Sequence, residues 1–111
     1  MLKRAQAARL LAVGPPASAA RLLILGRGEA VIGSADACAL QIAEASVADS
    51  HAVISRRRGR YVVSDFKSAG GTFVNDKRAR RTRTLKHRDT IRFGAETVYR
   101  FIDPDASMRL L

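Results

Sequence analysis

The residues that could carry catalytic or metal chemistry in this sequence are few, and their spacing argues against both. Its two histidines, His51 and His87, are far apart without metal-ligand spacing, and a single cysteine, Cys38, excludes an internal disulfide and a cysteine-cluster zinc site. Ser50 precedes His51 directly, and neighbouring residues of a strand point to opposite faces. The sequence also lacks a glycine-rich phosphate loop that opens a helix. We therefore expect no enzymatic activity, no metal and no cofactor.

Basic residues form the second chemically active group, and they are concentrated in the middle of the chain. The 111 residues include 20 Lys plus Arg and 10 Asp plus Glu, for a formal net charge of +10. Residues 56–92 alone hold 13 basic and three acidic residues, and 13 − 3 = +10. The predicted basic patch consists of Arg56, Arg57, Arg58, Arg60, Lys77, Arg78, Arg80, Arg81 and Arg83.

This patch has two interpretations. Guanidinium groups make forked contacts to phosphate or carboxylate, and arginine outnumbers lysine here. The patch thus predicts a protein partner that is acidic or phosphorylated, or nonspecific binding of nucleic acid. The alternative is a hairpin tip and a loop that are merely solvated.

Neither a membrane span nor an export signal is predicted. No stretch approaches about 18 uninterrupted apolar residues, the length that a spanning helix requires. The basic start of the chain is followed by apolar residues, but Gln6 and Arg9 interrupt them before a signal-peptide core can form. A single cysteine fits a reducing compartment. We expect a cytoplasmic protein with no membrane partner.

The elements that must position the polar residues are predicted to be short β-strands. Apolar runs are short and end at turn residues: residues 22–25 end at Gly26, and residues 30–32 end at Gly33. After the first arginine run, Gly59 supplies the positive φ of a hairpin turn. About ten such segments at regular spacing predict an all-β fold, a β-sandwich of about 10–11 short strands.

The same pattern predicts the core and the domain limits. Residues 2–12 are the one segment where apolar residues could share a helical face. We expect an N-terminal tail of residues 1–7, one domain of residues 8–104 and a C-terminal tail of residues 105–111. The predicted inward-facing residues are Leu23, Leu25, Ile32, Ala52, Ile54, Tyr61, Val63, Phe73, Ile91, Phe93, Tyr99 and Phe101.

Four blocks of sequence, residues 32–34, 47–54, 65–75 and 85–94, resemble a known family in the right order. They are similar to the "IGR", "VSRxHAxI", "DxxSxNGTxVN" and "LxxGDxIxxG" blocks of the forkhead-associated (FHA) domain. The resemblance extends over residues 8–104. It implies an eleven-stranded β-sandwich whose loops at one end bind phosphothreonine peptides, and hence a signalling adaptor without enzymatic activity.

The residues that hold the family's loops together are retained. The resemblance implies that His51 lies beneath the loops and ties them together by hydrogen bonds. Gly71 permits a backbone conformation that residues with a Cβ rarely adopt. Ser68 and Asn75 can cap neighbouring turns with side-chain hydrogen bonds. The predicted loop scaffold consists of Gly33, His51, Gly71, Thr72 and Asn75.

By contrast, the residues that contact phosphothreonine peptides in the family are replaced. The arginine after the first loop glycine is Ser34 here, and the serine three residues before the histidine is Ala48. The basic residue that follows is Asp49, whose charge would repel a phosphate. The asparagine before the Gly-Thr pair is Gly70. The predicted binding-loop positions are Ser34, Ala48, Asp49, Ser50, Ser68, Ala69 and Gly70.

These replacements predict a degenerate FHA domain. A charge-assisted hydrogen bond contributes about 1.5–3 kcal/mol. Losing two or three such bonds weakens phosphopeptide binding by about 10³ or more. The favoured function is therefore a protein-interaction module that recognises its partner without phosphothreonine.

Two alternatives stay open. Phosphothreonine binding is retained if Arg27, Ser46, Ser50 or Lys67 substitutes for the lost contacts. Anion or nonspecific nucleic-acid binding is the function if the surface of residues 56–92 is the active one. Dimerisation through an exposed sheet face is compatible with the sequence.

Overall fold

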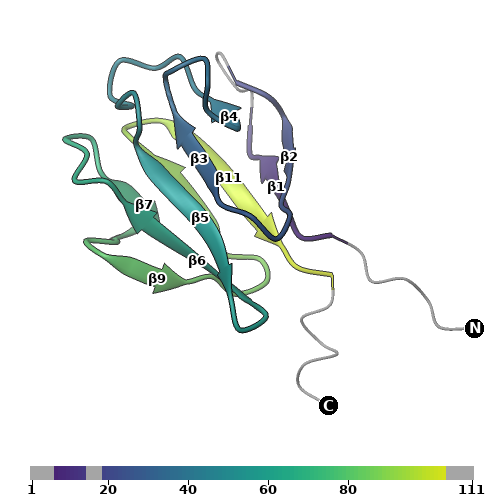
Figure 1. Ribbon diagram of the computed structural model, residues 1–111. Coiled ribbons are helices and arrows are strands. Elements are labelled where there is room, and N and C mark those ends of the chain that lie inside the picture. Colours follow the sequence, from purple (N-terminus) through teal and green to yellow (C-terminus); the bar gives the residue numbers. More distant parts are fainter. Residues whose placement is uncertain (1–6, 15–18, 105–111) are drawn as a thin grey trace, which may run out of the picture.

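Two β-sheets packed face to face form the fold (Figure 1). The computed structural model describes residues 7–14 and 19–104. The six-stranded sheet has the order β2-β1-β11-β10-β7-β8 and consists of β1 (Arg9–Ala12), β2 (Leu22–Ile24), β7 (Thr72–Val74), β8 (Lys77–Arg78), β10 (Thr90–Phe93) and β11 (Thr97–Ile102). The five-stranded sheet has the order β4-β3-β5-β6-β9 and consists of β3 (Ala30–Gly33), β4 (Leu40–Gln41), β5 (Ala52–Arg57), β6 (Arg60–Asp65) and β9 (Thr82–Thr84).

The predicted all-β sandwich is confirmed. The described residues form eleven strands and no helix. All strand pairs are antiparallel except β3 and β4, which pair in parallel. Because the described part of the chain has no helix, it also contains none that is long and apolar enough to span a membrane.

The core lies between the sheets, and period-two alternation explains its membership. All but two of the predicted inward residues are buried. Leu23 packs against the core but is only partly buried. Phe73 was predicted to face inward, and this is wrong: Thr72 and Val74 are its buried neighbours, so Phe73 must lie on the outer face of the sheet.

The helical face predicted for residues 2–12 is also wrong where the structure describes it. Arg9–Ala12 form β1, which pairs with β2 on one side and β11 on the other. Leu10 is fully buried whereas Leu11 is 39% exposed, which is the alternation of a strand. Residues 1–6 and 105–111 lie outside the described residues, so the predicted domain limits stay a prediction.

The strand directions place the connecting loops at two opposite ends of the sandwich (Figure 1). One end, here called the loop end, carries the residues 34–39, 42–50, 66–71 and 94–96 that connect β3 to β4, β4 to β5, β6 to β7 and β10 to β11. The opposite end, here called the hairpin end, carries the tight turn between β5 and β6. Arg57 pairs with Arg60, and the two residues between them, Arg58 and Gly59, have φ values of 52° and 77°. Two successive positive φ values are typical of a type I′ hairpin, so the predicted turn is confirmed.

Candidate functional site

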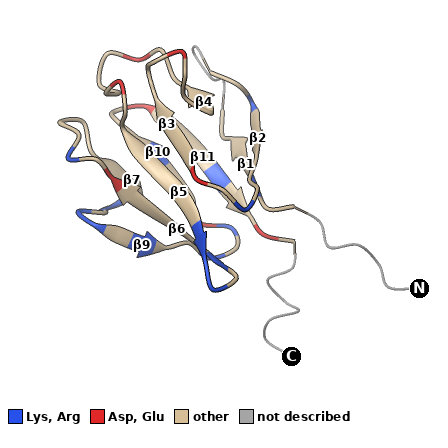
Figure 2. Ribbon diagram, viewed as in Figure 1, with Lys and Arg blue, Asp and Glu red and all other residues tan. Residues whose placement is uncertain are grey.

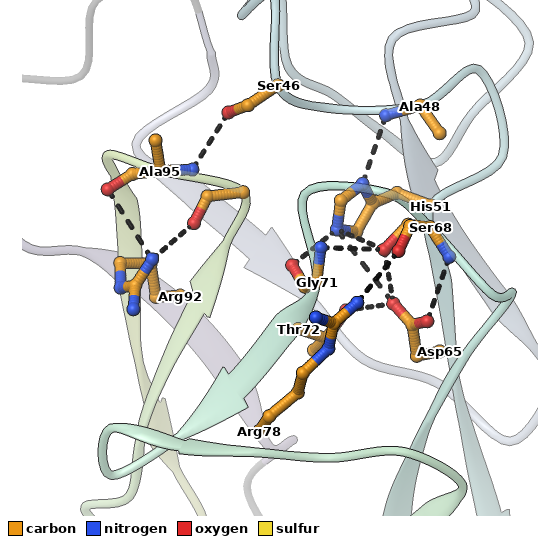
Figure 3. Close-up of polar contacts among 11 residues, drawn as sticks. Ser46, Ala48, His51, Asp65, Ser68, Gly71, Thr72, Arg78, Arg92 and Ala95 are labelled. Carbon is orange, nitrogen blue, oxygen red and sulfur yellow. Dashed lines mark hydrogen bonds and ion pairs between the residues drawn. The ribbon is translucent and has the colours of Figure 1, made fainter.

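The loop end is held together from below by His51, whose side chain is fully buried (Figure 3). Its Nδ1 accepts a hydrogen bond from the Ala48 amide at 3.0 Å, and its Nε2 lies 2.7 Å from the Gly71 carbonyl oxygen. Because Nδ1 is an acceptor, Nε2 carries the proton and donates to Gly71. His51 thus connects the loop before β5 to the loop before β7.

Asp65 organises the second of these loops. Its Oδ1 accepts hydrogen bonds from Ser68 Oγ at 2.6 Å and from Thr72 Oγ1 at 2.8 Å, and its Oδ2 accepts one from the Ser68 amide at 2.9 Å. Ser68 Oγ in turn accepts a bond from the Gly71 amide at 3.0 Å. The sequence analysis did not select Asp65, although a carboxylate three residues before a serine is a recognisable turn signal.

These side chains form a Ser-His-Asp cluster, which the sequence did not predict. Ser68 Oγ lies 3.1 Å from His51 Nε2, and Asp65 Oδ1 lies 4.0 Å from the same nitrogen. However, the proton of Ser68 is donated to Asp65, and both nitrogens of His51 are occupied by backbone partners. His51 therefore has no free lone pair with which to activate Ser68. The cluster braces the loops, and its geometry does not support nucleophilic catalysis.

Two of the predicted binding-loop positions bond to each other. Ser34 Oγ donates a hydrogen bond to Asp49 Oδ1 at 3.0 Å. The Ser34 amide donates to the Ala48 carbonyl at 2.9 Å, and the Ala35 amide donates to the Asp49 carbonyl at 3.3 Å. Hydroxyl and amide donors that could otherwise receive an external anion are thus satisfied within the protein.

Gly70 is required because the neighbouring loop comes very close to it. A Cβ at this position would lie 2.1 Å from the Ser46 carbonyl oxygen, well inside van der Waals contact. The loop before β5 therefore occupies the space that a side chain at Gly70 would need. Gly71 is required for a different reason, since its φ of +81° lies in the left-handed region.

Comparison with known protein families matches residues 30–94 to the FHA domain. The chain belongs to the FHA domain family. FHA domains are protein-interaction modules and generally have no enzymatic activity.

Solved structures agree with this assignment. The structure of EmbR from Mycobacterium tuberculosis, in complex with a low-affinity phosphopeptide, matches this chain with a TM-score of 0.79 and 27% sequence identity. The match covers 87% of this chain and 24% of the EmbR chain. The N-terminal FHA domain of Rad53p from S. cerevisiae, in complex with a phosphothreonine peptide, has a TM-score of 0.78 and 15% identity, covering 96% and 100%. An FHA domain from Arabidopsis thaliana has a TM-score of 0.77 and 21% identity, covering 93% and 92%. The last two likenesses concern the fold alone, and this chain spans about a quarter of EmbR.

A second polar cluster of this FHA domain surrounds Glu44, which the sequence analysis also missed. Its carboxylate accepts hydrogen bonds from the amides of Ala95 at 3.2 Å and Glu96 at 3.1 Å, and from the hydroxyls of Ser46 and Thr97. Burial raises the pKa of the carboxyl, but the four hydrogen bonds outweigh burial, so its pKa lies below the ordinary value of 4.5. Glu44 thereby ties the loop before β5 to the turn before β11.

The four connections that define the loop end carry four carboxylates and one lysine, a net charge of −4 + 1 = −3 (Figure 2). Arg21, Arg80 and Arg81 lie at the same end, in the β1–β2 and β8–β9 connections, because Ala12 pairs with Tyr99 and Thr82 pairs with Ser64. The end as a whole is therefore neutral, and its carboxylates are concentrated in the four connections. The charged residues of these connections are Asp36, Glu44, Asp49, Lys67 and Glu96.

Arg78, which lies outside these connections, contacts one of them directly. Arg78, from β8, donates a hydrogen bond to the Ser68 carbonyl at 3.0 Å. Its guanidinium carbon also lies 6.0 Å from the ring centre of Phe73. Arg78 therefore braces the β6–β7 loop from the outer side of β7, because it pairs with the outward-facing Phe73.

The four residues expected to substitute for the lost contacts have different placements. Arg27 precedes β3 and Ser34 follows it, so Arg27 lies at the opposite end of the sandwich. Ser46 is bonded to Glu44 and to the Ala95 amide. Ser50 and Lys67 are exposed at the loop end and are the two that stay candidates.

The predicted basic patch is distributed over two places. The arginines of residues 56–60 lie at the hairpin end, where Arg56 covers the ring of Tyr61 at 5.7 Å. Residues 77–83 lie along β8 and β9, which are the edge strands of the two sheets. Asn75, predicted to support a turn, bonds to Asp89 at 2.9 Å and to the Thr90 amide at 3.0 Å. The described residues contain no group of three or more potential ligands that could hold a metal ion.

Proposed function

We propose that this FHA domain is a protein-interaction module whose loop end binds a partner segment without phosphothreonine. The observation that carries this proposal is the hydrogen bond between Ser34 and Asp49, because these positions hold positive charge in the family's usual phosphate site. EmbR, which shares the fold, is solved with a low-affinity phosphopeptide. The N-terminal FHA domain of Rad53p, which also shares the fold, is solved with a phosphothreonine peptide. We infer that the same loops recognise a peptide here with different chemistry.

The carboxylates of the loop end support a partner segment that is neutral or basic. A phosphate brought between the β3–β4 and β4–β5 loops would meet the exposed carboxylate of Asp49, and like charges repel. Lysine or arginine side chains of a partner would instead be attracted to Asp49 and to Asp36, the exposed carboxylates of these two loops.

The proposal is tested with peptide libraries that differ only at one fixed residue. Three libraries carry phosphothreonine, threonine or lysine at the centre, and binding is measured by fluorescence polarisation. We expect the lysine and threonine libraries to bind at least as well as the phosphothreonine library. Micromolar binding of the phosphothreonine library, with no binding of the threonine library, would contradict the proposal.

A gain-of-function variant sharpens this test. Ser34→Arg combined with Asp49→Lys removes the internal pair and restores two cations, so phosphothreonine affinity should rise by about tenfold or more. Asp36→Arg combined with Ala39→Lys makes the same charge change of +3 at exposed positions of the same end and serves as the control. An equal gain in both variants would show that only general charge matters.

A second candidate function, nonspecific binding of polyanions, is favoured by the hairpin end. Arg57 and Arg60 lie directly opposite each other in the hairpin, and such like-charged cross-strand pairs are destabilising. A polyanion would relieve this repulsion. We expect duplex DNA to bind with an affinity that falls steeply as salt is added. In a plot of log K against the logarithm of salt concentration, each phosphate contact should add about 0.9 to the downward slope. The double variant Arg57→Gln, Arg58→Gln should lower that slope, whereas an absence of binding at low salt would eliminate this function.

A further inference from the structure

The outer face of the six-stranded sheet combines aliphatic side chains with arginines. Cross-strand partners point to the same face, so the register of β1 with its neighbours defines the residues involved. Leu11 pairs with Leu22 on β2 and with Arg100 on β11, and Arg9 pairs with Ile24. These five residues, here called the β1–β2 face, therefore lie side by side on the outside of the sandwich.

The apolar part of this face is unusually exposed. Leu11, Leu22 and Ile24 are 39%, 46% and 52% exposed, and all three rank among the large hydrophobic residues that the described structure leaves accessible. Scattered exposed hydrophobic residues are ordinary on a protein surface, but contiguous ones mark interaction sites. Strand pairing makes these three contiguous.

The charges on this face have one sign. The outward positions of β1, β2, β10 and β11 alternate with the buried ones. In the described strands these positions hold only aliphatic residues, threonine and arginine, so they carry no carboxylate. Arg9 is held in place by hydrogen bonds from its guanidinium to the Ala7 carbonyl, the shorter of which is 3.0 Å. Arginine is enriched in protein-binding hot spots, and here a positioned guanidinium lies beside contiguous exposed aliphatic residues.

The size of the face suits one helix. Three neighbouring strands span about 10 Å, because adjacent strands are about 4.8 Å apart. An α-helix with its side chains has a diameter of about 10 Å, so a single helix covers β2, β1 and β11.

We propose that the β1–β2 face binds an amphipathic helix of a partner protein whose aliphatic stripe is flanked by glutamate or aspartate. Charge complementarity selects this occupant over a second copy of the chain, because two such faces would bring arginine against arginine with no carboxylate between them. The face belongs to the edge of the sheet opposite β7 and β8, so it is separate from the loop end and from the function proposed for it.

The test uses three synthetic helical peptides of about 14 residues, which is about four turns. The first has a leucine stripe flanked by glutamate, the second has lysine in place of glutamate, and the third has serine in place of leucine. Fluorescence polarisation is measured at about 0.15 M salt to limit long-range attraction. We expect the first peptide to bind at least about tenfold more tightly than the other two, because it alone supplies both the apolar stripe and the carboxylates.

Matched protein variants locate the binding. Arg100→Glu, and separately Leu22→Ser with Ile24→Ser, should each weaken binding of the first peptide by about tenfold, since both remove part of the β1–β2 face. Arg57→Glu makes the same charge change at the hairpin end and should alter binding less than about twofold. Because all these residues are exposed, no variant should lose stability, and melting temperatures are checked first.

Several outcomes would overturn the inference. Equal losses in Arg57→Glu and Arg100→Glu would show general attraction to a basic protein. Equal binding of the leucine and serine peptides would show that the apolar residues take no part. Another such outcome is that the protein sediments with vesicles of phosphatidylcholine and phosphatidylglycerol. If the Leu22→Ser, Ile24→Ser variant lost this sedimentation, the face would be assigned to a membrane. Dimerisation in analytical ultracentrifugation that the same variant abolishes would assign it to a second copy.

Discussion

The loop end and the hairpin end of this FHA domain use their charged residues in opposite ways. At the loop end, Glu44, Asp49 and Asp65 are bonded to hydroxyls and amides of the protein itself. At the hairpin end, four arginines of residues 56–60 crowd one turn, and only Arg56 has a described internal contact, over a ring. Internal bonds fix the carboxylates of the first end, while repulsion leaves the arginines of the second available to an external anion.

The largest expected effect comes from removing the histidine beneath the loops. His51→Ala leaves the Ala48 amide and the Gly71 carbonyl without partners and opens a cavity, so the free energy of unfolding should fall by about 3–5 kcal/mol. Thermal unfolding followed by circular dichroism should show a decrease of at least about 10 °C. His87→Ala is the control: His87 is exposed and accepts one bond from the Asp103 amide. Similar losses in both variants would mean that His51 does not hold the loop end together.

The close approach at Gly70 predicts the next largest effect. Gly70→Asn, which restores the family's residue, forces the Cβ against the Ser46 carbonyl and should destabilise the domain by about 1–3 kcal/mol. Gly28→Ala is the control, because nothing lies within 4 Å of a Cβ there. Denaturant unfolding measures both changes, and a neutral Gly70→Asn would show that the loop before β5 yields readily.

A smaller and pH-dependent effect is expected at Glu44. Because hydrogen bonds hold its pKa below 4.5 in the folded protein, the ionised carboxylate stabilises the fold above the unfolded pKa. This contribution is lost as the pH falls below 4.5 and passes through the folded pKa. Glu44→Gln should therefore cost about 1 kcal/mol at pH 7, and this cost should shrink progressively as the pH falls below 4.5. Glu96→Gln removes a neighbouring carboxylate as the control, and a difference that persists unchanged in acid would disprove the assignment.

The smallest effect concerns the arginine pair of the hairpin. Arg57→Glu replaces a like-charged cross-strand pair by an opposite-charged one, so it should stabilise the domain by about 0.5 kcal/mol. The gain should diminish in high salt because the pair is exposed. Urea unfolding at two salt concentrations measures it, with Arg88→Glu as a control outside the hairpin. Destabilisation by Arg57→Glu would indicate that Arg57 makes a favourable contact.

The sequence predicted the features that depend on local periodicity. Alternation located most strands and most of the core, and Gly59 marked the hairpin. Alternation failed at Phe73, because a strand of three residues is too short to show which of its residues face inward. In the structure Thr72 and Val74 face inward, so Phe73 faces outward. The prediction from sequence also failed at residues 9–12, where pairing with β2 and β11 overrides a weak helical face.

The candidate site was predictable by position but not by contact. The family motifs gave the predicted binding-loop positions. They did not give the bond between Ser34 and Asp49, which joins residues 15 apart, or the bonds of Glu44, which reach about 50 residues along the chain. Such contacts depend on how loops meet in space, and no local pattern encodes them. For the same reason, only the fold shows that Arg27 lies at the end opposite Ser34.

The Ser46 carbonyl over Gly70 gives this domain a direction of evolutionary change. Restoring the family's asparagine first would create a clash, and moving the loop first would break the bonds that Ser46 makes with Glu44 and Ala95. Each of these single steps is therefore unfavourable. Substitutions that keep the Ser46 carbonyl in place should be accepted more readily than those that add a side chain at Gly70.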